Sequence, residues 1–207
     1  MCIRDSSWDD AHFESCGQQW MLLAEPRCAV ALVNQSSYGH DVSPAGGDEH
    51  TPTMGVMARL TLLRSPQSPD PHPDQGRHHI VYSLLTDARI ESAHVEAARL
   101  NQPLQVRSGT VELPSTARIE PVHGTTVIDA VKQAFDGFGD LVIRIHEAEG
   151  ARSRVRLLLD QDGCVSEVDL LEDPIDEPTQ QLPASTCSKV ELTLRPFQIL
   201  TLRVSQR

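Results

Sequence analysis

The stretch that decides the fold is residues 29–42, AVALVNQSSYGHDV. Residues 29–33 are all apolar, and a short apolar run that ends in turn-forming residues is typical of a buried β-strand. Asn34, Ser36, Ser37 and Gly39 follow, and such residues bend a backbone through side-chain hydrogen bonds or a positive φ. We therefore predict a buried strand, a tight polar turn and the start of a strand that returns beside it.

The flanking sequence extends this pattern. Residues 21–25 are predicted to form a strand that pairs with 28–34 across a turn at Pro26 and Arg27. Residues 56–64 alternate with a period of two, which predicts a strand with one well-buried face. The intervening segment 43–52 is rich in Gly, Pro and Ser and is expected to be a hairpin tip. Residues 65–76 hold four prolines, which predicts a stiff loop that is neither helix nor central strand.

The remainder of the chain is predicted to be strands separated by short turns, with one helix. The helix is expected over 91–100, where Ala93, Ala97 and Leu100 recur at helical spacing. A turn is expected at Asp162 and Gly163, and a long acidic loop over 173–183. The strands are predicted over 78–85, 104–113, 125–135, 141–148, 152–160, 164–171, 189–195 and 197–204.

The fold class predicted from this pattern is all-β. Short strands with turns at regular intervals are typical of an antiparallel β-sandwich, here with one short helix. The chain is expected to form either one sandwich or two sub-sandwiches, with a first portion over 7–113 and a second over 114–207. Residues 1–6, MCIRDS, resemble sequencing-adaptor read-through and are expected to be non-native.

Composition and charge exclude several classes of partner. The 207 residues carry a formal net charge of −11, so no dense basic patch is expected to bind nucleic acid or an anionic membrane. No run approaches the ~20 apolar residues of a membrane span, and the N-terminus lacks the pattern of a signal peptide. The five cysteines are widely spread without a CxxC pair, which favours reduced thiols. We therefore expect a cytoplasmic protein.

Several motifs occur together in a consistent order. In the first half they are VNQSSYGHDV and LTLLRSPQSPDPHPDQGRHHIVYSLL, and in the second half they are AVKQAFDGFGDLVIRIHEAEG, VDLLED and ELTLRPFQILTLRV. Together they resemble the C-terminal β-sandwich region of the α-mannosidases of glycoside hydrolase family 38, especially the branch of bacterial and cytosolic enzymes. The sequence departs from the family pattern where Gln35 replaces the usual Asp and His146 replaces the usual Tyr.

The resemblance implies an enzyme that hydrolyses terminal α-mannosyl linkages with retention, and hence carbohydrate binding and a role in mannose metabolism. In this family the catalytic carboxylates and a divalent metal, usually zinc, belong to an N-terminal domain. No motif here corresponds to the paired carboxylates that such chemistry needs. We therefore expect no catalytic residue, metal ligand or cofactor in this chain, which should be inactive alone. Its expected partners are that N-terminal catalytic domain and an α-mannoside, and the sequence permits a homo-oligomer.

Two polar loops carry much of the resemblance and form the candidate site. The first lies around residues 34–40 and the second around residues 70–78. Nothing in hairpin mechanics requires a tyrosine in the first loop or an Asp-Gln-Gly turn in the second. One hypothesis is that the loops help to wall the sugar pocket of the catalytic domain. The alternative is that they only pack and cap the fold. The candidate residues are Asn34, Tyr38, Gly39, Asp70, Asp74, Gln75 and Gly76.

Other interpretations are weighed against this one. Asp70, His72 and Asp74 could form a weak cation site, although acidic loop residues are more often only solvated. His78 and His79 are adjacent and would face opposite sides of a strand, which favours surface and packing roles over shared metal binding. The chain could instead be a stand-alone carbohydrate-binding or assembly module without catalysis, but an aromatic content of 4% makes a stacking platform for sugars hard to build.

Overall fold

The computed structural model describes residues 14–45, 55–66, 68–104, 106, 108–109 and 117–205. The chain divides into two compact units, residues 1–105 (unit 1) and 106–207 (unit 2). The adaptor-like residues 1–6, most of the hairpin tip predicted over 43–52 and most of the strand predicted over 104–113 lie outside the described residues. The predicted portions 7–113 and 114–207 stay a prediction.

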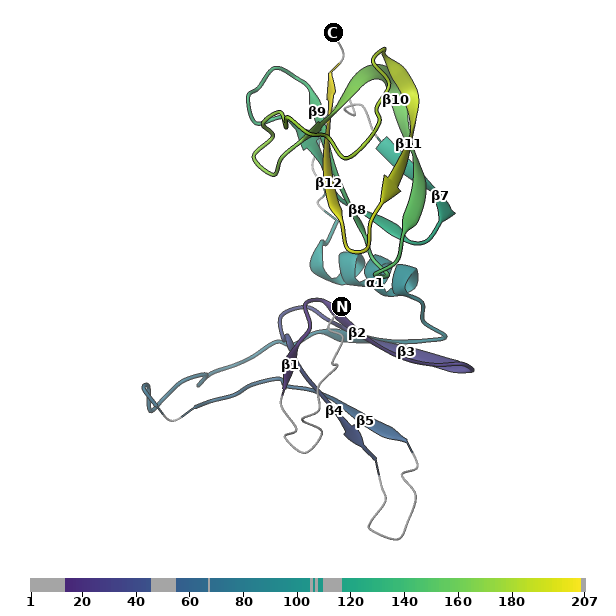
Figure 1. Ribbon diagram of the computed structural model, residues 1–207. Helices are drawn as coiled ribbons and strands as arrows, with labels where there is room; N and C mark the ends of the chain where they lie inside the picture. The colour runs from purple at the N-terminus through teal and green to yellow at the C-terminus, as the bar shows by residue number, and fades with distance from the viewer. Residues whose placement is uncertain are drawn as a thin grey trace. The chain divides into compact units, whose positions relative to one another are not determined.

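Unit 1 contains two three-stranded antiparallel sheets (Figure 1). One has the order β2-β3-β6 and the other the order β1-β4-β5. The strands are β1 (Ser15–Cys16), β2 (Trp20–Glu25), β3 (Cys28–Asn34), β4 (Gly39–Pro44), β5 (Val56–Leu60) and β6 (Tyr82–Thr86).

The central strand of the first sheet, β3, is the apolar run that the sequence predicted. It pairs with β2 as predicted, with Met21 opposite Leu32, and with β6 on its other side, with Leu84 opposite Leu32. Ala31 and Val33 are fully buried. The prediction that β4 returns beside β3 is wrong, since β4 pairs with β1 and β5. Because both sides of β3 already hold a neighbour, the polar turn carries the chain into the second sheet.

One helix, α1 (Ile90–Asn101), packs against the first sheet, and it confirms the helix predicted over 91–100. Ala93 and Ala97 are fully buried, and their small side chains let the helix approach the strands closely. Trp20 of β2 packs edge-on against His94 of the helix, with ring centroids 5.1 Å apart. The buried core of unit 1 therefore lies between helix and sheet: Trp20, Ala31, Val33, Ala88, Ala93 and Ala97.

Strand β5 is shorter and less buried than predicted. It ends at Leu60, and Val56 and Met57 are 55% and 45% exposed. The strand lies at an edge of the second sheet, and none of its residues belongs to the core cluster of unit 1. The well-buried face predicted from the alternation is therefore wrong, because the described part of unit 1 gives this edge strand no core to face.

Unit 2 is a set of antiparallel strands in the order β11-β10-β12-β9-β8, with β7 also paired to β10 (Figure 1). The strands are β7 (Ala117–His123), β8 (Thr126–Gln133), β9 (Leu141–Glu147), β10 (Ser153–Val168), β11 (Cys187–Leu194) and β12 (Ile199–Ser205). Their inward side chains form one apolar core that includes Ile143, Ile145, Leu157, Leu192 and Leu202, all fully buried. The antiparallel strands and the short helix confirm the all-β fold class.

Strand β10 is one strand of 16 residues, whereas two strands and a turn at Asp162 and Gly163 were predicted. Its first half pairs with β7 and β11, and its second half pairs with β12. A Cβ atom at Gly163 would lie 2.4 Å from Cγ1 of the buried Val204. Glycine is therefore needed there because β12 approaches closely, not because the chain turns.

Strand β7 was not predicted. Pro121 interrupts its sequence, and a proline within a run argues against a central strand. Among the described residues the strand pairs only with β10, which makes it an edge strand there, where a missing backbone N–H is tolerated.

Candidate functional site

The polar turn between β3 and β4 is organised by the buried side chain of Asn34. Its Nδ2 donates to the carbonyl of Ser37 and, at 3.4 Å, to that of Gly17. Its backbone N–H donates to the carbonyl of Gln19, and its own carbonyl accepts from Asn101 Nδ2 of α1 at 3.0 Å. Asn34 is only 1% exposed. It therefore positions the turn and does not present a group to solvent.

Tyr38 and His40 occupy opposite environments in this turn. The Tyr38 side chain is 42% exposed, whereas His40 is 3% exposed. The carbonyl of Tyr38 accepts from the Gly17 N–H at 2.8 Å and lies 3.0 Å from His40 Nδ1, which donates to it in the Nδ1–H tautomer. Burial lowers the pKa of His40, although its hydrogen bond to the Tyr38 carbonyl acts in the opposite direction. The ring is therefore held neutral inside unit 1.

This buried neutral histidine predicts a pH dependence of unit 1. Near pH 6.5 the unfolded chain binds more protons at His40 than the native chain does, so stability falls as the pH drops from 7 towards 5. His40→Gln is expected to flatten this slope, which for one histidine is at most about 1.4 kcal/mol per pH unit. Urea unfolding monitored by tryptophan fluorescence measures it, because Trp8 and Trp20 both belong to unit 1.

His79→Gln is the matched control, because His79 is exposed. An equal flattening of the slope in both variants would contradict the assignment to His40.

Gly39 begins β4 directly beside the carboxyl end of the Glu14 side chain. A Cβ atom there would lie 1.7 Å from Oε1 of Glu14. Glu14 in turn forms an ion pair with Arg64, just beyond β5. The glycine thus allows a carboxylate to lie across the turn, and the turn is tied to the start of the proline-rich segment.

The second predicted loop belongs to a long arm between β5 and β6, which extends away from the strands of unit 1 (Figure 1). Its carboxylates bind backbone groups of the arm itself. Asp70 Oδ1 accepts from the His72 N–H at 2.8 Å, and Asp74 Oδ2 accepts from the Ser65 N–H at 3.1 Å. The His78 ring lies 2.7 Å from the carbonyl of Asp74. The arm is therefore ordered by its own polar contacts.

The two remaining candidate residues, Gln75 and Gly76, lie in the turn of the arm. Gln75 Nε2 lies 3.1 Å from His72 Nδ1. Gly76 has a φ of +138°, which a residue with a side chain rarely adopts. Within the described ranges, no group of three or more His, Cys, Asp or Glu side chains is placed to hold a metal ion. Asp70 and Asp74 act here as caps of backbone N–H groups.

The two loops remain separate within unit 1. No hydrogen bond or ion pair joins residues 34–40 to residues 70–78 in the part of the chain that the structure describes. The first loop is a compact turn around a buried asparagine, and the second is the tip of an arm. Of the candidate residues in the first loop, Tyr38 has the exposed side chain.

A buried carboxylate in unit 2 was not predicted to have a role. Glu147, at the end of β9, is fully buried. It accepts N–H groups from Glu149 and Gly150 at 2.8 Å and from Phe197 at 2.9 Å. Burial alone would raise its pKa, but these backbone donors outweigh burial and leave the pKa lowered.

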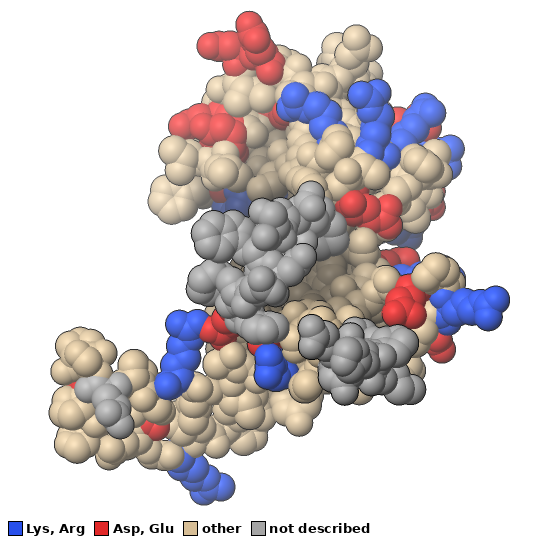
Figure 2. Space-filling model, turned by 60° about the horizontal axis from the view of Figure 1, so that its bottom comes forward, with Lys and Arg blue, Asp and Glu red and all other residues tan. Residues whose placement is uncertain are grey.

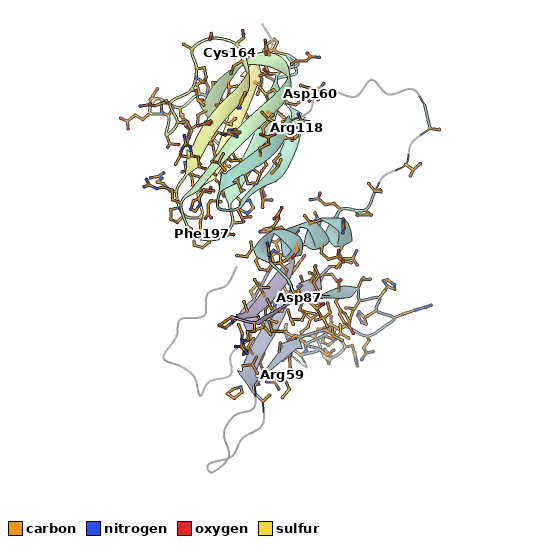
Figure 3. The ribbon with its side chains drawn as sticks, turned by 90° about the vertical axis from the view of Figure 1, so that its right-hand side faces the viewer. Arg59, Asp87, Arg118, Asp160, Cys164 and Phe197 are labelled. Atoms are coloured by element: carbon orange, nitrogen blue, oxygen red, sulfur yellow. The ribbon has the colours of Figure 1, made fainter. Side chains whose placement is uncertain are left out.

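The environment of Glu147 joins two turns at one end of unit 2, where Phe197 lies (Figure 3). Gly150 has a φ of +73°, and a Cβ atom there would lie 2.5 Å from Cζ of Phe197. The aromatic ring therefore packs directly over the glycine. The spacing of a glutamate three residues before a glycine, in EAEG, was the available sequence signal for this capped turn.

The surface and the helix content of the described residues add two observations. On the face shown in Figure 2, Lys and Arg side chains lie among Asp and Glu side chains and wide uncharged areas. The helix found in the described residues, α1, is too short to cross a membrane.

The sequence matches two family models in the order in which they occur along the chain. Residues 3–72 match the glycosyl hydrolases family 38 C-terminal domain, and residues 125–202 match the glycosyl hydrolases family 38 C-terminal beta sandwich domain. The candidate turn and Glu147 therefore each lie within one of the matched segments.

Curated relatives agree with these matches. The chain is 33% identical to alpha-mannosidase 2C1 of Homo sapiens over 96% of its length, and 33% identical to alpha-mannosidase G of Dictyostelium discoideum over 70%. It is 24% identical to an alpha-mannosidase of Saccharomyces cerevisiae over 97%. The chain spans 18%, 13% and 19% of the lengths of these three relatives. The chain thus belongs to the C-terminal region of glycoside hydrolase family 38.

Proposed function

We propose that this chain is the C-terminal part of an α-mannosidase and supports hydrolysis of terminal α-mannosyl linkages by a catalytic domain that precedes it in the same polypeptide. The observation that carries the proposal is the match along 96% of the chain to a relative named alpha-mannosidase. That match covers 18% of the relative, so a preceding domain has room to supply the chemistry.

The proposal assigns retaining, metal-dependent chemistry to the preceding domain. A divalent ion such as zinc would be bound there by residues of that domain. Cys28, Cys164 and Cys187 are free thiols, which suits a reducing compartment, and we propose a cytoplasmic location.

The test is an assay of the polypeptide encoded by the extended reading frame. We expect hydrolysis of an aryl α-mannoside with retention at the anomeric carbon, loss of activity on chelation of the metal, and recovery on addition of zinc. A polypeptide with a preceding domain that binds metal but does not cleave α-mannosides would overturn the proposal.

Within this function, we infer that the loops around Tyr38 and Asp74 help to wall the sugar pocket. The exposed Tyr38 ring on a tightly held turn and the self-supported arm are the features that support this role. In the same assay, Tyr38→Phe and Asp74→Ala are each expected to lower kcat/KM at least tenfold, or about 1.4 kcal/mol.

Two control variants separate pocket contacts from loop folding. Tyr82→Phe removes a hydroxyl from another exposed tyrosine of unit 1, on β6, and should leave kcat/KM unchanged. Asp74→Asn keeps an oxygen that can accept the Ser65 N–H, so it distinguishes the loop cap from the charge. Unchanged kcat/KM in both Tyr38→Phe and Asp74→Ala would refute a role of the two loops in the sugar pocket.

A further inference from the structure

Two loops of unit 2 present large apolar side chains to solvent. One is the turn between β8 and β9, and the other follows β10 and contains the sequence DLLE at 169–172. Both loops lie on the same side of unit 2 in Figure 1. Their exposed apolar residues, which we call the apolar tip, are Phe135 (92% exposed), Leu171 (80%), Phe138 (69%) and Leu170 (61%).

The two loops are tied to each other by Glu172. Its Oε2 accepts the backbone N–H of Phe135 at 2.7 Å, and its Oε1 forms an ion pair with Lys132 of β8. The hydrogen bond from Lys132 and that from the Phe135 backbone lower the pKa of Glu172. The turn that carries Phe135 and the loop that carries Leu171 are therefore held together.

Hydrogen bonds within the DLLE loop also hold its conformation. Asp169 Oδ1 accepts the backbone N–H groups of Leu171 at 2.8 Å and Asp173 at 2.9 Å. Arg144 Nη2 donates to the carbonyl of Leu170 at 3.2 Å. The polar residues of the motif thus fix the loop, and the two leucines between them are displayed. A surface that is already ordered loses little entropy when it binds.

The apolar tip has no role in the core of its own unit. None of its four residues belongs to the core cluster of unit 2. Of three neighbouring carboxylates, Glu172 pairs with Lys132, whereas Asp136 and Asp140 share Arg203, so this group of ion pairs keeps a net negative charge. Contiguous exposed apolar side chains mark interaction sites. Exposed apolar side chains beside a net negative charge fit an apolar protein surface better than a polyanion or an anionic membrane, which like charge would repel.

We propose that the apolar tip docks onto the part of the polypeptide that precedes this chain. This inference rests on the proposed function, in which that part is the catalytic domain. The observation that selects this occupant is length, since the chain spans 18% of the relatives named alpha-mannosidase 2C1 and most of such a polypeptide lies outside it. A tethered neighbour is also present at high effective concentration, so a small rigid patch suffices to hold it.

The test places a photoreactive benzoylphenylalanine at position 135 or 171 of the full-length polypeptide, and in a control at position 122. Val122 is an apolar residue of β7 that is also exposed, at 42%, but it lies outside the apolar tip. After irradiation, mass spectrometry is expected to find cross-links to the part of the polypeptide that precedes this chain. Positions 135 and 171 should give at least fivefold more of these cross-links than position 122.

Cross-links to a second copy, cross-links confined to unit 2, or equal yields from all three positions would overturn docking by the apolar tip. α-Mannosidase activity measured on the same preparations separates the two proposals. Full activity without the expected cross-links refutes the docking alone, whereas the expected cross-links in a polypeptide that does not hydrolyse α-mannosides refute the proposed function alone.

Discussion

Replacing Glu147 by Gln is expected to lower the free energy of unfolding of unit 2 by about 3 kcal/mol. The buried carboxylate accepts backbone N–H groups from two separate turns, at residues 149–150 and 197. An amide keeps one acceptor oxygen and turns an NH₂ group towards donors that it cannot satisfy, and each buried unsatisfied donor costs about 1–3 kcal/mol. For a unit of this size the loss corresponds to a fall in Tm of about 15 °C.

The measurement must isolate unit 2, because all tryptophan and tyrosine residues belong to unit 1. Calorimetry combined with tryptophan fluorescence identifies the transition of unit 2 as the one without a fluorescence change. Glu149→Gln is the matched control, since this neighbouring carboxylate is exposed and accepts a hydrogen bond from the Thr125 hydroxyl at 2.6 Å. A similar Tm for the Glu147→Gln variant and the wild type would contradict the assigned role.

The same carboxylate contributes to the acid sensitivity of unit 2. Its lowered pKa means that the native state binds fewer protons than the unfolded state once the pH falls towards the ordinary glutamate value of 4.5. Its contribution to stability is therefore present at neutral pH and is lost as the pH drops below that value. The Glu147→Gln variant should lack this part of the acid destabilisation.

Leu157→Ala is expected to have an effect of similar size, about 3 kcal/mol. Leu157 is fully buried in the first half of β10, and a leucine truncated in a closed core costs its transfer free energy and leaves a cavity. Amide hydrogen exchange of β9 and β12, which line the same core, measures the loss as faster exchange in unit 2 without a change in unit 1.

Leu158→Ala is the matched control for this variant. Leu158 is the next residue along the strand, points to the opposite face and is partly exposed. We expect a loss below about 1 kcal/mol for this surface position. Equal losses in the two variants would mean that the alternation of β10 is assigned wrongly.

The predictions from sequence were most successful where local chemistry decides the structure. The apolar run of β3, its hairpin with β2 and the helix α1 follow from composition and periodicity alone. The alternation over 56–64 was misleading, because a period of two shows which residues share a face but not whether another layer covers it. Burial of β5 depends on tertiary neighbours that no local pattern encodes.

A glycine caused the error in the boundaries of β10. Gly163 was assigned to a turn, yet it lies within β10 where Val204 of the neighbouring strand leaves no room for a side chain. A glycine required by close packing and one required by a turn look the same in a sequence. Pro121 suits β7 because this strand lies at an edge, a position that its pairing with β10 creates and that local sequence does not show.

The candidate site shows the same division. The motif residues around Asn34 and Asp74 could be found from sequence, but their structural roles could not. Asn34 is buried, and Asp74 caps a backbone N–H nine residues away. No role was predicted for Glu147. Its role depends on Phe197, a partner 50 residues further along the chain, which spacing cannot reveal.

The long strand β10 also has a consequence for how unit 2 comes apart. One half of it is hydrogen-bonded to β7 and β11, and the other half to β12. Detaching it would strip a neighbour from three strands at once, so neither side of the unit has a route to melt while the other stays intact. Such a shared element couples the whole of unit 2 into one cooperative transition, and damage to either half of β10 is felt by both.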